Sequence, residues 1–135
     1  MIKKIEHIGI AVQNLSDAIP IYEKLFETTC YKKEQVTSEG VITAFFKIGD
    51  SKIELLQATH QDSPIAKFLE RRGGGFHHIA FDVEDIEHEI SRLQQQGFDL
   101  LHSTPKDGAD NKRIAFMHPK SSLGMLIELC QEKSS

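Results

Sequence analysis

The fold is decided by a stretch that occurs twice: residues 78–86, His-Ile-Ala-Phe-Asp-Val-Glu-Asp-Ile, repeat residues 7–15, His-Ile-Gly-Ile-Ala-Val-Gln-Asn-Leu. A second repeated segment follows each copy: Leu-Ile-Glu-Leu at residues 126–129 repeats Lys-Ile-Glu-Leu at residues 52–55. Each half of the chain therefore carries one histidine near its start and one glutamate near its end. A pattern that occurs only twice predicts a duplicated supersecondary unit rather than a solenoid.

Alternating apolar residues, turn residues and helix caps predict the same order of elements in both halves. The expected strands cover residues 5–12, 29–37, 41–48 and 51–58 in the first half, and 76–83, 98–103, 112–118 and 124–131 in the second. The expected helices begin after Asn14 or Ser16, after Ser63 with Pro64 in the first turn, and after Asp85. Residues 103–111 are expected to form a loop.

This order predicts an α+β fold, in which two tandem βαβββ modules form a curved, partly closed mixed sheet around a metal cavity, with the helices outside. A chain of 135 residues is the size of one domain. We expect a single domain over residues 1–135, with module 1 at about 1–61, a linker helix at about 62–73 and module 2 at about 74–135.

Composition excludes several classes of partner. The net charge is −4 and both signs are scattered along the chain, which argues against a nucleic-acid-binding surface. No run of 18 apolar residues is present, so we expect no membrane span, and the first residues have no signal-peptide pattern. Two cysteines, Cys30 and Cys130, lie in no ligand or redox spacing, which is typical of the reducing cytoplasm.

The faces of the strands indicate what the repeated polar residues do. His7 and His78 each share a strand face with small residues, whereas bulky apolar residues occupy the opposite face. Glu54 and Glu128 each lie between apolar neighbours, where a buried carboxylate is costly unless it is paired or bound to a metal. Two histidines and two glutamates account for one another if one divalent cation per chain lies among them.

Each residue also has a structural alternative. A single histidine on a strand is more often structural, and a single glutamate in an apolar strand can face solvent, but two matched pairs make coincidence a poor explanation. We expect His77 to be structural and Cys130 to be a buried hydrophobic residue, while His118 could line the cavity. Among metals we expect Co²⁺ first, with Ni²⁺, Mn²⁺ or Zn²⁺ as alternatives. The expected chemistry is Lewis-acid stabilisation of an enolate with a carboxylate moving the proton: Glu128 as one base, and Glu54 or a metal-held water serving the other face.

A resemblance to a known family adds to these expectations. It rests on residues 7–12, on Asp-Ser-Pro-Ile-Ala-Lys-Phe-Leu at 62–69, on Gly-Phe-His-His-Ile-Ala-Phe at 75–81, and on Phe-Met-His-Pro-Lys at 116–120 leading to 124–129. With these segments the chain resembles the vicinal oxygen chelate (glyoxalase-type) superfamily, and within it the methylmalonyl-CoA epimerases, over nearly its whole length. The resemblance implies a metal bound by His7, Glu54, His78 and Glu128, and a homodimer.

The resemblance also implies epimerisation at C2 of methylmalonyl-CoA, an acyl-CoA substrate. Some similar proteins carry a glutamate, proposed as an acid/base, at the position of Thr43, and others an apolar residue. The CoA phosphates require cations, for which Lys120 and Arg113, with Lys112 and Lys106, are the candidates around one loop. The alternatives are a glyoxalase I-type lyase acting on glutathione hemithioacetals and a non-catalytic ligand-binding protein of the same fold. Iron dioxygenases of the superfamily use two histidines and one glutamate, so a fourth ligand argues against them.

Overall fold

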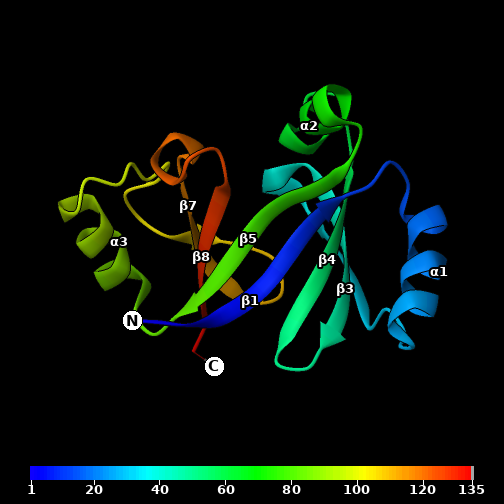
Figure 1. The fold of residues 1–135 in the computed structure, drawn as a ribbon, viewed down its shortest axis with the longest axis horizontal. Coiled ribbons are helices and arrows are strands. Elements are labelled where there is room, and N and C mark those ends of the chain that lie inside the picture. Colours follow the sequence, from blue (N-terminus) through cyan, green and yellow to red (C-terminus); the bar gives the residue numbers. More distant parts are fainter. Residues whose placement is uncertain (135) are drawn as a thin grey trace. The chain divides into compact units, whose positions relative to one another are not determined.

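The computed structural model describes residues 1–134. Within them, eight strands are hydrogen-bonded in the order β2-β3-β4-β1-β5-β8-β7-β6, and both parallel and antiparallel pairs occur. The elements follow one another as βαβββ, a connecting helix and βαβββ (Figure 1). The predicted α+β class, with a mixed sheet built from two repeated modules, is therefore confirmed. The chain divides into two compact units, residues 7–77 and residues 1–6 together with 78 onward, so β1 and β5 each contribute to both.

The unit of residues 7–77 contains the first module. Its elements are β1 (Ile2–Ala11, from residue 7), α1 (Leu15–Phe26), β2 (Lys32–Val36), a 3-10 turn η1 (Thr37–Glu39), β3 (Val41–Ile48), β4 (Ser51–Ala58) and α2 (Pro64–Arg72). β1 and β4 are parallel, and β3 is antiparallel to β2 and β4. α1 packs on Leu55 and Phe46, whereas α2 packs on Ala11 and Leu56. Because these residues alternate along their strands, the two helices cover opposite faces.

The other unit repeats this plan. Its elements are β5 (Gly75–Val83, from residue 78), α3 (Ile86–Gln95), β6 (Lys106–Asp107), β7 (Lys112–Met117), a 3-10 turn η2 (Pro119–Ser122) and β8 (Leu126–Glu132). β5 and β8 are parallel, and β7 is antiparallel to β6 and β8. α3 buries Ile86, Ile90 and Leu93 against a cluster that includes Val83 and Leu129. These three residues lie at positions i, i+4 and i+7, so they form the buried face of this helix.

The predicted helix starts are confirmed. The side chain of Asn14 accepts hydrogen bonds from the first turn of α1, that of Ser63 from Ala66 in α2, and that of Asp85 from His88 in α3. Each residue satisfies backbone N–H groups that have no partner inside the helix. Within the described residues, no helix has the length and apolar character needed to cross a membrane.

One predicted strand is wrong. Residues 98–103 form only an isolated bridge, between Leu100 and Met117, and the short strand β6 lies instead inside the predicted loop 103–111. Phe98 and Leu100 pack against the core under α3, so their apolar character reflects helix packing rather than pairing in a ladder. Pro105 has no backbone N–H to donate, and the continuous ladder with β7 lies after it, at Lys106 and Asp107.

Candidate metal centre

The first pair of candidate ligands is His7 on β1 and Glu54 on β4. The parallel register aligns Gly9 with Glu54, so the glutamate shares the face of His7 and lies two residues further along the paired strand. His7 Nδ1 is 3.2 Å from Glu54 Oε2. The two residues are only 3% and 5% exposed, so the contact is shielded from water.

The second pair, His78 on β5 and Glu128 on β8, repeats this arrangement in the other unit. The parallel register aligns Ala80 with Glu128, which gives the same offset of two residues between histidine and glutamate. His78 Nε2 is 3.3 Å from Glu128 Oε1, and both residues are 5% exposed. The duplication seen in the sequence therefore extends to the strand register and to a close His–Glu contact, which is made by Nδ1 of His7 in the first pair and by Nε2 of His78 in the second.

The local sequence explains why each glutamate faces away from its helix. Leu55 is fully buried in the cluster under α1, and Leu129 is buried in the cluster under α3. Neighbouring residues on a strand point to opposite faces, so burying each leucine under a helix turns the preceding glutamate to the other face. Aromatic residues at equivalent positions flank both pairs, since Phe45 is the cross-strand partner of Glu54 and Phe116 that of Glu128.

The donor set fits a divalent cation. Each pair places an imidazole nitrogen and a carboxylate oxygen side by side in a buried setting, where a carboxylate needs a compensating charge or hydrogen bonds. Two ligand atoms that are each about 2.1 Å from one cation lie about 3.0 Å apart at a right angle and about 3.4 Å apart at a tetrahedral angle. The measured separations of 3.2 and 3.3 Å lie between these values. Imidazole and carboxylate are suitable ligands for cobalt, nickel, manganese and zinc.

Neighbouring candidates have other surroundings. Thr43 is buried and lies diagonally across from Glu54 on the same face, since it pairs with Leu56. Cys130 is fully buried beside Ala80, and burial raises the pKa of its thiol far above the usual range. It is a buried apolar residue, as predicted.

The remaining histidines that could compete as ligands have structural contacts. The His77 ring packs edge-on against Phe68 with centroids 4.9 Å apart, and burial, together with Arg71, lowers its pKa to about 4. His118 Nδ1 accepts a hydrogen bond of 3.1 Å from the N–H of Lys120, so His118 caps the turn η2. His77 therefore behaves as the structural residue that the sequence predicts.

The basic residues assigned to the substrate do not gather around one loop. Arg113 lies near the start of β7 and Lys120 in the turn after its end, so the rest of the strand, residues 114–117, lies between them. Arg113 Nη1 is 3.0 Å from Glu87 Oε1 and holds the pKa of that carboxyl below its usual range. Lys120 Nζ is 3.0 Å from Asp99 Oδ2. The expected cluster is therefore wrong for Lys120, because an extended strand carries it away from the other candidates.

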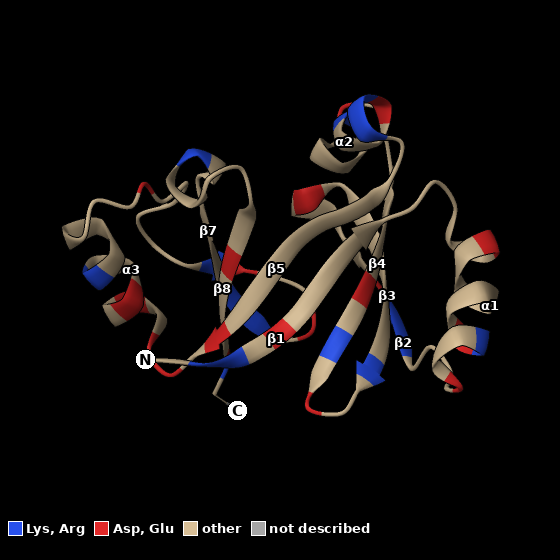
Figure 2. Ribbon diagram, viewed as in Figure 1, with Lys and Arg blue, Asp and Glu red and all other residues tan. Residues whose placement is uncertain are grey.

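The other two basic candidates contact groups of the protein near Arg113. Lys112 is buried, with its Nζ 3.9 Å from carboxylates of both Glu6 and Glu132. Lys106 Nζ lies 5.9 Å from the centroid of the Phe116 ring. The helices α1, α2 and α3 each carry both acidic and basic residues (Figure 2), so none of them presents a purely basic surface.

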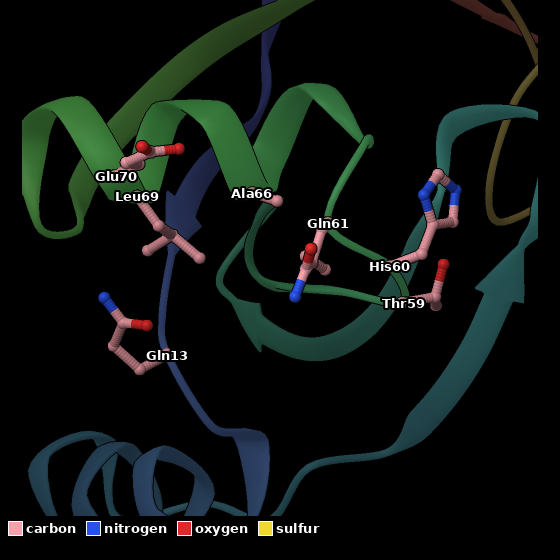
Figure 3. A pocket seen from close by; sticks show the side chains of 8 residues that line it. Gln13, Thr59, His60, Gln61, Ala66, Leu69 and Glu70 are labelled. Carbon is pink, nitrogen blue, oxygen red and sulfur yellow. The ribbon is translucent and has the colours of Figure 1, made fainter.

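A separate pocket of about 410 Å³ lies in the unit of residues 7–77, where β1 and β4 end. Leu69 and Glu70 of α2 line one side, Gln13 another, and the loop that contains Thr59 and His60 a third (Figure 3). None of the predicted ligands or catalytic residues lines this pocket.

Two further residues were missed at the sequence level. The side-chain oxygen of Gln57 accepts a hydrogen bond from the N–H of Leu15, and that of Gln131 accepts one from the N–H of Ile86. The signal was present, because the shared pattern extends to Ile-Glu-Leu-x-Gln at residues 53–57 and 127–131.

Comparison with known proteins agrees with this architecture. The chain is 39% identical to an ethylmalonyl-CoA/methylmalonyl-CoA epimerase of Cereibacter sphaeroides over 97% of this chain and 99% of the relative. It is 37% identical to a mitochondrial methylmalonyl-CoA epimerase of Dictyostelium discoideum over 95% of this chain and 78% of the relative.

Among solved structures, a variant of the Streptomyces coelicolor methylmalonyl-CoA epimerase in complex with 2-nitronate-propionyl-CoA superposes with a TM-score of 0.96 at 32% identity, over 99% of this chain and 97% of that one. Residues 6–116 match a family described as the glyoxalase/bleomycin resistance protein/dioxygenase superfamily. With its two βαβββ modules and this match over most of its length, the chain belongs to that superfamily.

Proposed function

We propose that this protein interconverts the two C2 epimers of methylmalonyl-CoA. The observation that carries the proposal is the pair of buried His–Glu contacts at the same register offset in both modules. The named relatives and the superposed epimerase structure, which cover nearly the whole chain, support this substrate over a glutathione hemithioacetal.

In this proposal His7, Glu54, His78 and Glu128 hold one divalent cation. Two carboxylates balance the charge of such an ion, and the ligand types suit Co²⁺, with Ni²⁺, Mn²⁺ or Zn²⁺ as alternatives. When bound, the cation supplies positive charge that stabilises the negative charge developing on the substrate oxygens as C2 is deprotonated.

The two glutamates also move the proton. Inversion at C2 requires removal of a proton from one face and delivery of a proton to the other. We assign Glu128 as one base, with its carboxylate oxygen taking the C2 proton. On the opposite face, Glu54 in the form that carries a proton, or a water held at the site, delivers a proton to C2, and the roles exchange in the reverse reaction. Thr43 lies on the face of Glu54, but its hydroxyl cannot replace a carboxylate as a base. If Glu128→Gln retains metal and full epimerase activity, this assignment is wrong.

We further propose that Lys120 and Arg113 bind the anionic CoA moiety, each by exchanging its present carboxylate partner for a phosphate. Lys120→Ala and Arg113→Ala should then raise the KM for methylmalonyl-CoA several-fold and leave kcat unchanged, since these contacts bind substrate and transition state alike. Lys24→Ala, at an exposed position in the last turn of α1, is the matched control. A KM unchanged in both variants would remove them from the substrate site.

The cellular setting is proposed on the same basis. Cys30 and Cys130 are both free thiols, which suits an enzyme of the reducing cytoplasm. We also propose that the protein is a homodimer. The test of the reaction is a direct comparison of purified protein on single-epimer methylmalonyl-CoA and on methylglyoxal with glutathione. Epimerisation without lyase activity supports the proposal, whereas lyase activity alone would assign the protein to the glyoxalase I reaction.

A further inference from the structure

Two glutamines tie the helices to the strands that carry the glutamates. Gln57 Oε1 accepts the N–H of Leu15 at 2.7 Å, and Gln131 Oε1 accepts the N–H of Ile86 at 2.9 Å. In both cases the donor is the first residue of a helix, and the glutamine follows the candidate ligand by three residues. The same long-range hydrogen bond therefore occurs once in each module, independently of the other.

These bonds are not ordinary helix caps. Asn14 Oδ1 already accepts the N–H groups of Ser16 and Asp17, and Asp85 Oδ1 accepts the N–H of His88. A local cap satisfies donors from within its own turn. The two glutamines instead reach the N–H of the first helical residue from positions 42 and 45 residues away.

The hydrogen bond between Gln57 and Leu15 joins β4 to the segment that follows β1, at a point close to the candidate ligand Glu54. β1 and β4 are joined through Val12, whose N–H donates to Leu56 O at 2.9 Å, and the Gln57 contact adds the next point beyond it. Leu55 and Gln57 both face α1, whereas Glu54 faces away from it. The apolar contact of Leu55 sets which face is buried, and the directional bond of Gln57 sets where along the strand the helix begins.

The register of the two strands determines whether histidine and glutamate meet. A slip of one residue between β1 and β4 would turn every β4 side chain to the other face and separate Glu54 from His7. Shifts of less than one residue would still change the distance of 3.2 Å between His7 Nδ1 and Glu54 Oε2 by a substantial fraction. The same reasoning applies to Gln131, Glu128 and His78 in the second module.

We propose that Gln57 and Gln131 are positioning residues that hold each His–Glu pair at the spacing required for metal binding. The inference rests on the metal site given under the proposed function. Groups that orient metal ligands without touching the metal typically change affinity by 10–100-fold. Because these glutamines act through a strand rather than through a hydrogen bond to the ligand, we expect the lower end, about tenfold, for either residue.

The test is a Co²⁺ titration of the full chain after removal of metal, followed by visible absorption and calorimetry. Gln57→Leu and Gln131→Leu should each weaken Co²⁺ binding about tenfold and alter the cobalt spectrum, while Gln57→Glu, which keeps an oxygen acceptor, should restore both. Gln35→Leu, at an exposed position in β2, is the matched control and should bind as the unaltered protein does. Folded leucine variants with lower thermal stability but unchanged Co²⁺ affinity and spectrum would overturn the inference.

A second measurement does not depend on how the variants fold. Coupling between two sites is reciprocal, so Co²⁺ should slow amide hydrogen exchange of Leu15 and Ile86 in the unaltered protein by about the same tenfold factor. The amides of Ala18 and Ile90, inside the same helices, are the internal comparison. Equal protection at all four amides would contradict the positioning role. An unaltered protein that binds no Co²⁺ would reject the metal site itself, which distinguishes the two failures.

Discussion

Replacing either candidate glutamate with glutamine should remove most of the thermal stabilisation that Co²⁺ gives the protein. Glutamine keeps the shape of the side chain and removes the carboxylate charge. A ligand that binds only the folded state, present at one hundred times its Kd, adds about 2.7 kcal/mol to the free energy of unfolding. With about 2.1 cal/mol/K of unfolding entropy per residue, the 135 residues correspond to ~0.28 kcal/mol/K, so Tm should rise by ~10 °C.

Groups that only orient metal ligands change metal affinity by up to ~100-fold. Loss of a ligand itself should therefore weaken Co²⁺ binding by at least this factor. At the same Co²⁺ concentration the stabilisation then falls to about 0.4 kcal/mol and the Tm shift to ~1.5 °C. Because the two pairs are equivalent in register and burial, Glu54→Gln and Glu128→Gln should behave alike.

The assay is differential scanning calorimetry of each variant with and without Co²⁺. Glu132→Gln, at the exposed end of β8, is the control and should keep the full shift. A full Co²⁺ shift in either Glu54→Gln or Glu128→Gln would refute the four-ligand site.

Two further outcomes follow from the packing. Leu55→Ala and Leu129→Ala should each lower the free energy of unfolding by about 3 kcal/mol in urea titrations, because both leucines are fully enclosed under a helix; a loss below ~1 kcal/mol would contradict this packing. In the folded protein only Cys30 should react with Ellman's reagent between pH 7 and 9, because burial keeps Cys130 protonated and inaccessible. Reaction of two thiols before unfolding would contradict the burial of Cys130.

The sequence was most informative where local and tertiary preferences agree. The alternation around His7 and His78 identified their strand face, and the caps Asn14 and Asp85 marked the helix starts, because each depends on neighbouring residues. The repeat then paired each histidine with the correct glutamate within its module, since two copies of one pattern fold alike.

The sequence was least informative where a contact depends on distant chain segments. Phe98 and Leu100 have the apolar character of a strand, but both pack against the hydrophobic cluster under α3. The position of Lys120 relative to Arg113 depends on the direction of β7, which no short pattern records. Gln57 was missed because its partner lies 42 residues away, although the repeated Ile-Glu-Leu-x-Gln pattern contained the signal.

The central claim is that this duplicated site ionises the C2 carbon acid of methylmalonyl-CoA. The most direct measurement is deuterium incorporation at C2 in D₂O, followed by NMR, with protein stripped of metal and then reloaded with Co²⁺. The account predicts rapid incorporation that depends on the restored metal. Absence of exchange in protein that binds Co²⁺ tightly would contradict it, and would leave the site with a different chelating substrate.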